Sequence, residues 1–173
     1  MFILWTIQIV PRGVRTGGML AAALAVSACG MGKPTPPEVR GADPVSVGRH
    51  VVRIGGCNDC HTADFMLGPV DESVWLKGSG VGFRGPWGVT YASNLRLTVD
   101  SMTEDDWVVM LSTRNGAPPM PWPSVHALSD AEKRALYRYI QSLGAPGAPA
   151  PVALPPGYPV HTPVIDMFPK APD

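Results

Sequence analysis

Residues 56–61 read Gly-Cys-Asn-Asp-Cys-His, and the interpretation of the whole chain starts from this stretch. Two cysteines three positions apart, followed directly by a histidine, form the pattern C-x-x-C-H, which is typical of covalent haem attachment. On one turn of helix Cys57 and Cys60 share a face, where each thiol can form a thioether with one vinyl group. His61 follows where an imidazole ligand of the iron is needed. The motif therefore predicts one covalently bound haem c.

Two other uses of a C-x-x-C pair compete with haem attachment. A dithiol redox pair does not need the histidine, so that interpretation leaves His61 without a role. Half of a zinc site needs a second Cys or His pair at ligand spacing, and the sequence offers none. Haem attachment is the interpretation that uses all three side chains.

The amino terminus has the pattern of a secretion signal. Two arginines precede an apolar run over residues 19–26, which is too short to span a bilayer. The run ends in Val-Ser-Ala-Cys-Gly, residues 26–30, which resembles the lipobox of bacterial lipoproteins and implies a lipid on Cys29. Ordinary signal cleavage beside an incidental cysteine is the alternative. We expect residues 1–28 to be a lipoprotein-type signal peptide and the mature chain to be anchored at the periplasmic side of a bacterial membrane.

Prolines divide the rest of the chain. They crowd residues 34–44 and 146–172 and bracket a middle of roughly 100 residues, a normal size for one domain. We therefore expect a proline-rich linker over 29–42, a folded domain over 43–144 and a proline-rich tail over 145–173. The 14 basic side chains balance the 14 acidic ones, so the charge gives no indication of nucleic-acid binding.

Three segments of the middle have helical periodicity and helix-end signals. The first begins at Asp43-Pro44 and places Val47, Val51 and Ile54 on one face, with Gly48 allowing a close helix neighbour. The second follows Thr103, and the third runs from a capping box at 129–132 to Gly144. Residues 62–101 are glycine-rich and aperiodic, as in a loop passing a flat cofactor. The prediction is an all-α fold of three to five helices around one haem, with long loops.

Residues 117–123, Ala-Pro-Pro-Met-Pro-Trp-Pro, are too rich in proline to form a helix. The stiffness would hold the Met120 sulfur in a fixed place, and a thioether suits haem iron in electron-transfer proteins. We predict Met120 as the ligand opposite His61. The alternatives are a proline-rich surface loop with a buried methionine, ligation by Met102, or bis-histidine ligation through His126.

The glycine-rich segment is most distinctive at Gly85-Pro86-Trp87-Gly88. A backbone carbonyl near Pro86 is expected to accept the Nδ1 proton of His61 and orient its ring. Five further side chains are candidates for lining the haem or bonding a propionate: Pro86, Trp87, Tyr91, Asn94 and Trp122. Ordinary loop packing is the alternative for all of them.

The order of these features resembles a class I c-type cytochrome over about residues 44–144: a helix, C-x-x-C-H, a glycine-rich loop, a helix, a methionine loop and a last helix. The stretches GPWGVTYASNL (85–95), TEDDW (103–107) and PPMPWPS (118–124) are similar to the cytochrome domains that serve bacterial periplasmic dehydrogenases. Those relatives often carry two or three haem domains in tandem. This chain has a single haem motif, so its electron partners must be other molecules.

The resemblance implies attachment through Cys57 and Cys60, axial ligation by His61 and Met120, and a carrier of single electrons rather than an enzyme. The implied donor is a dehydrogenase or another cytochrome, and the acceptor a downstream carrier or terminal oxidase. Two alternatives remain open. One is a haem-based gas sensor or peroxidase-like enzyme with a displaceable sixth ligand. The other is a cytochrome subunit that stays bound to a dehydrogenase, with the proline-rich tail as a docking arm.

Overall fold

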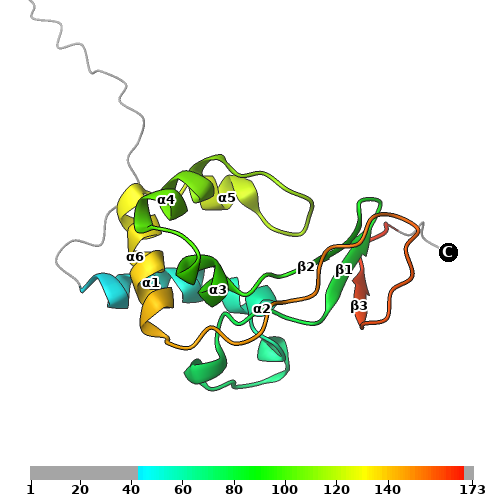
Figure 1. Ribbon diagram of the computed structural model, residues 1–173, viewed down its shortest axis with the longest axis horizontal. Coiled ribbons are helices and arrows are strands. Elements are labelled where there is room, and N and C mark those ends of the chain that lie inside the picture. The colour runs from blue at the N-terminus through cyan, green and yellow to red at the C-terminus, as the bar shows by residue number, and fades with distance from the viewer. Residues whose placement is uncertain (1–42, 170–173) are drawn as a thin grey trace, which may run out of the picture. The chain divides into compact units, whose positions relative to one another are not determined.

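The structure is a computed structural model that describes residues 43–169 (Figure 1). The predicted signal peptide, the predicted lipidation site Cys29 and the predicted linker up to residue 42 lie outside the described residues. Within 43–169 no helix combines the length and the apolar character needed to cross a membrane.

Along the described chain, strands β1 and β2 lie between two groups of helices, and β3 follows the last helix. The elements are α1 (Pro44–Ile54), α2 (Cys57–His61), η1 (Phe65–Leu67), η2 (Glu72–Val74), β1 (Gly82–Gly85), β2 (Gly88–Tyr91), α3 (Leu95–Asp100), α4 (Glu104–Thr113), α5 (Trp122–His126), α6 (Asp130–Ser142) and β3 (Val164–Asp166).

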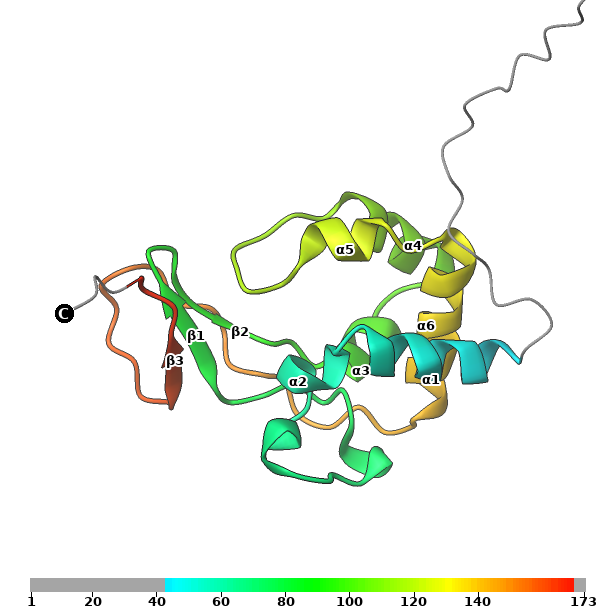
Figure 2. The ribbon, with the colours of Figure 1, turned by 180° about the vertical axis from the view of Figure 1, so that it is seen from behind.

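Helices α1 and α6 cross in close contact at Gly48 (Figures 1 and 2). A Cβ atom at Gly48 would overlap the carbonyl oxygen of Ala135 and come within 2.6 Å of Cβ of Tyr139. The α1 start is as expected, since the Asp43 carboxylate accepts a hydrogen bond from the Ser46 amide and Pro44 occupies the first turn. The prediction that Gly48 admits a helix neighbour is confirmed.

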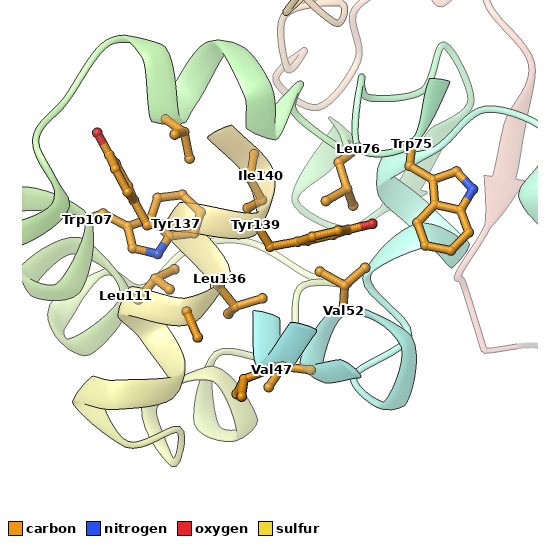
Figure 3. Close-up of a cluster of buried hydrophobic side chains, with 13 residues drawn as sticks. Val47, Val52, Trp75, Leu76, Trp107, Leu111, Leu136, Tyr137, Tyr139 and Ile140 are labelled. Atoms are coloured by element: carbon orange, nitrogen blue, oxygen red, sulfur yellow. The ribbon is translucent and has the colours of Figure 1, made fainter. Parts of the chain in front are cut away.

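The core is formed by α1, α4 and α6 together with the Trp75-Leu76 pair (Figure 3). Leu76 is fully buried, and Nε1 of Trp107 donates to the Lys133 carbonyl at 2.9 Å. The prediction for the end of α1 is wrong, because Ile54 is 70% exposed and Val52 is buried instead. Each residue of an α-helix is turned by about 100° from the one before it, so Ile54, two residues after Val52, lies on nearly the opposite side of the helix.

The all-α expectation is also wrong, because the structure contains a three-stranded sheet of order β2-β1-β3. Strands β1 and β2 are antiparallel, and β3 pairs with β1 in parallel, with Gly82 opposite Val164. The hairpin turns at Pro86-Trp87, and Gly88 follows with φ of 98°, a conformation that favours glycine. Strands of three or four residues are too short to give a periodic signal, and the third comes from the far end of the chain.

The carboxy-terminal segment packs along this hairpin. Val89 and Leu154 exchange two backbone hydrogen bonds of 2.8 and 2.9 Å, and a Cβ atom at Gly88 would overlap the Leu154 carbonyl. The side-chain amide of Asn94 donates to the Pro146 carbonyl at 2.6 Å. Asn94 also caps α3, a helix that the sequence analysis missed within the glycine-rich segment.

Candidate functional site

The C-x-x-C-H motif forms a short helix of its own. Gly56 adopts a left-handed conformation with φ of 61°, which ends the α1 segment and turns the chain into α2. Cys57 and Cys60 are half-buried, and neither is part of a disulfide. His61, the last residue of α2, is buried.

A single hydrogen bond fixes the imidazole of His61. Its Nδ1 lies 2.7 Å from the carbonyl oxygen of Ser93, and a carbonyl can only accept, so Nδ1 carries the proton. The lone pair of the neutral ring is then on Nε2. Burial lowers the pKa of His61 below its ordinary value of 6.5, and the hydrogen bond to the Ser93 carbonyl opposes this shift only in part. Because the pKa is lowered, the ring is neutral at pH 7.

The sequence analysis expected a carbonyl near Pro86 to orient His61. This expectation is wrong, because the carbonyl that does so belongs to Ser93. The hairpin turn carries Pro86 away towards the carboxy-terminal segment, and the chain returns to α2 only after β2. Sequence patterns give no signal for Ser93, because a backbone carbonyl has no side-chain signature.

The two cysteines are held as thiols. Burial raises the pKa of Cys57 to about 11, and burial together with the Asp59 carboxylate raises the pKa of Cys60. Dithiol redox pairs depend on a thiolate with a lowered pKa, so this environment does not suit that chemistry. Within residues 43–169, no three His, Cys, Asp or Glu side chains gather as a metal site.

Two buried side chains behind the motif hold α2 in place. The Thr62 hydroxyl donates to Oδ1 of Asn58 at 2.7 Å and accepts from the Leu76 amide at 2.7 Å. The Gly78 amide donates to the His61 carbonyl, also at 2.7 Å. The sequence analysis missed Asn58 and Thr62, although their spacing of four residues is a usable helix-contact signal.

Two buried N–H groups have no hydrogen-bond partner within the described residues, namely Nδ2 of Asn58 on α2 and Nε1 of Trp122 on α5. Leaving such a donor unpaired costs about 1–3 kcal/mol, so orphaned groups of this kind are rare in folded proteins. At each of these places a bound group with a hydrogen-bond acceptor would give the N–H donor the partner that it lacks.

Met120 lies half-buried in the connection between α4 and α5. Its carbonyl accepts from the Trp122 amide at 2.9 Å. Helix α5 begins at Trp122, so the expectation that residues 117–123 form no helix is wrong for the last two of them. Pro123 is tolerated there because the amides of a first helical turn need no partner in the helix. In Figures 1 and 2 this connection is drawn above α2, on the side of α5. Among the hydrogen bonds and ring contacts of residues 43–169, none joins Met120 to α2.

The haem-lining candidates other than Trp122 contact the hairpin and the carboxy-terminal segment. Nε1 of Trp87 donates to the Phe83 carbonyl at 3.3 Å, and the hydroxyls of Tyr91 and Thr162 are 2.7 Å apart. Pro86 lines a half-open cavity of about 610 Å³ between the hairpin turn and residues 155–168. The polar atoms of these side chains thus bind neighbouring protein segments.

Comparison of the chain with protein-family models, with curated proteins and with solved structures finds no match. The functional argument therefore rests on the residues and their geometry.

Proposed function

We propose that this protein is a monohaem c-type cytochrome that carries single electrons between redox partner proteins. One observation carries the proposal: a buried imidazole, tied through Nδ1 to the Ser93 carbonyl, directly follows two unbridged thiols on the same short helix. Metal-binding histidines characteristically donate their second nitrogen in this way, which fixes the tautomer and the ring orientation. When bound, the haem supplies reversible one-electron exchange at its iron.

The residues around α2 suit the demands of such a group. Cys57 and Cys60 would hold it through thioethers, and Nε2 of His61 would ligate the iron. The orphaned N–H groups of Asn58 and Trp122 support the same assignment, because haem propionates are strong acceptors and would satisfy buried donors. The raised pKa of Cys57 adds support, since it leaves dithiol redox chemistry without its thiolate.

Met120 is the proposed sixth ligand. It is half-buried in a connection whose prolines restrict the backbone, so little conformational entropy would be lost when its sulfur is held in place. Together with the His61 imidazole, this thioether would hold the haem iron and would raise its potential. The chain then offers no open site for a substrate, so the proposed role is electron transfer and not catalysis.

The proposal includes the cellular setting predicted from the amino terminus. A lipid on Cys29 would anchor the domain at the periplasmic side of a bacterial membrane, with residues 29–42 as a semi-rigid spacer. A dehydrogenase or another cytochrome would donate the electron, and a downstream carrier or terminal oxidase would accept it.

The test is expression in a host that matures c-type cytochromes, followed by mass and visible spectroscopy. We expect one covalent haem per chain, a low-spin ferrous spectrum, and a far-red sulfur-to-iron band in the oxidised protein. Met120→Ala should abolish that band and leave the covalent haem in place. Met66→Ala is the matched control, because Met66 follows the motif but is 73% exposed.

Two results would contradict the proposal. Exported wild-type protein without haem would remove the cofactor assignment entirely. Rapid carbon monoxide binding by the ferrous wild-type protein would instead favour a gas sensor or a peroxidase-like enzyme with a displaceable sixth ligand.

A further inference from the structure

The connection that carries Met120, residues 114–121, contacts α5 through its first residue, Arg114. Nε2 of His126 donates to the Arg114 carbonyl at 2.9 Å, and the Arg114 guanidinium lies 5.6 Å from the centre of the Trp122 ring. These contacts tie the start of the connection to α5, which continues from its other end. They leave its middle to be fixed by a more distant element.

Thr90 on β2 supplies that contact. Its hydroxyl donates to the carbonyl oxygen of Pro118 at 2.6 Å, across 28 positions of sequence. The same hydroxyl is 3.5 Å from the Phe83 carbonyl, and its single proton is better placed for the shorter bond. Pro118 precedes Met120 by two residues, and the backbone between them is restricted by proline.

The donor stands on a hairpin that is itself held by the carboxy-terminal segment. Strand β3 pairs with β1, and Arg84 makes two hydrogen bonds of 2.6 Å to the Asp166 carboxylate. The hydroxyls of Tyr91 and Thr162 add a contact from the residue next to Thr90. The hydroxyl of Thr90 is thus carried by an element with several anchors rather than by a free loop.

We propose that Thr90 is a positioning residue for the Met120 sulfur. Its hydrogen bond gives the 114–121 connection a third fixed point, and the stiff Pro118-Pro119 backbone transmits that position to Met120. The inference rests on the proposed function, in which Met120 is an axial ligand. It adds that the sheet and the carboxy-terminal segment set how firmly this ligand is held.

The test compares three variants of the full-length holoprotein. Thr90→Val removes the hydroxyl and keeps the shape, and valine suits a strand, so folding is preserved. Thr90→Ser restores the donor. Thr98→Val is the matched control, because the Thr98 hydroxyl also donates to a carbonyl, that of Asn94 at 3.0 Å, but within α3.

We expect Thr90→Val to increase two rates, that of carbon monoxide binding to the ferrous protein and that of imidazole binding to the ferric protein. Each rate should rise about two- to tenfold, which corresponds to the loss of one neutral hydrogen bond. The far-red band should weaken in parallel. Thr90→Ser and Thr98→Val should stay within twofold of the wild type. A purely structural role would lower the urea midpoint of Thr90→Val without this selective change in ligand exchange.

Hydrogen exchange of the 114–126 region gives a readout that does not need the iron ligand. Thr90→Val should speed exchange at the Trp122 amide, which donates to the Met120 carbonyl, and leave α6 unchanged. Unchanged exchange and unchanged ligand binding in Thr90→Val would overturn the positioning role while the wild-type spectrum still supports the proposed function. A wild-type protein without the sulfur-to-iron band would overturn the function, and with it the role of Thr90 towards a ligand.

Discussion

At the scale of single residues, Arg96 joins parts of the chain that the sequence separates widely. The side chain is 3% exposed, and its guanidinium donates to five backbone carbonyls, four at 2.6–3.0 Å and the fifth at 3.5 Å. Nε binds the Trp75 carbonyl at 2.8 Å, and one terminal nitrogen binds the Leu143 carbonyl at 2.6 Å. Arg96 therefore holds the segment behind α2 against the end of α6.

Replacing Arg96 by lysine should cost much of this stability. Lysine keeps the charge but has one nitrogen in place of a planar fork, so several buried carbonyls lose their donor. We expect Arg96→Lys to lower the free energy of unfolding by about 2–4 kcal/mol, measured by urea denaturation. The matched control is Arg138→Lys, at an exposed pair with Glu104, where the loss should stay below about 1 kcal/mol. Equal losses in both variants would contradict the role of Arg96.

The same residue shows what a sequence can and cannot predict at this scale. Cys57, Cys60 and His61 stand out in the sequence because haem attachment would require those side chains at that spacing, and this assignment stays a prediction. Arg96 and Ser93 were missed for a physical reason. Both act through backbone carbonyls, and which carbonyl comes close depends on the tertiary fold.

At the scale of elements, the crossing of α1 and α6 depends on the absence of one side chain. Gly48→Ala adds a Cβ atom that would overlap the Ala135 carbonyl, so the two helices must separate. Alanine favours a helix by about 1 kcal/mol over glycine, but overpacking should outweigh this and give a net loss of about 1–3 kcal/mol. Gly80→Ala is the control, because a Cβ atom there meets open space. A Gly48→Ala protein as stable as the wild type in thermal unfolding would refute the close crossing.

Element prediction was reliable where helix-end chemistry was explicit and failed where pairing was non-local. The capping box of Ser129 and Glu132 and the start of α1 at Pro44 are confirmed. The sheet was missed because β1 and β2 are short and their partner β3 lies near the carboxy terminus. The proline-rich tail was interpreted as a flank on composition, while its strand signal amounts to the three residues Val164–Asp166.

At the scale of the whole molecule, one carboxylate connects the two crossing helices to the loop that follows the C-x-x-C-H motif. Oε1 of Glu72 accepts from Nε of Arg49 at 2.8 Å and from the Tyr139 hydroxyl at 2.6 Å. Glu72 begins η2, whereas its partners lie on α1 and α6. The hydrogen bond from Arg49 is the main reason that the pKa of Glu72 falls below its ordinary value of 4.5.

This lowered pKa makes the stability depend on pH in a defined direction. A carboxyl whose pKa is lower in the folded chain stabilises the fold above its unfolded pKa, and that contribution is lost as the pH falls through the folded value. Glu72→Gln should therefore be less stable than the wild type at pH 7, and the difference should shrink as the pH falls below about 4.5. Urea denaturation of both proteins between pH 7 and pH 3 measures it. A stability difference that stays constant over this range would show that Glu72 acts through packing, since only an ionised carboxylate gives the pH-dependent part.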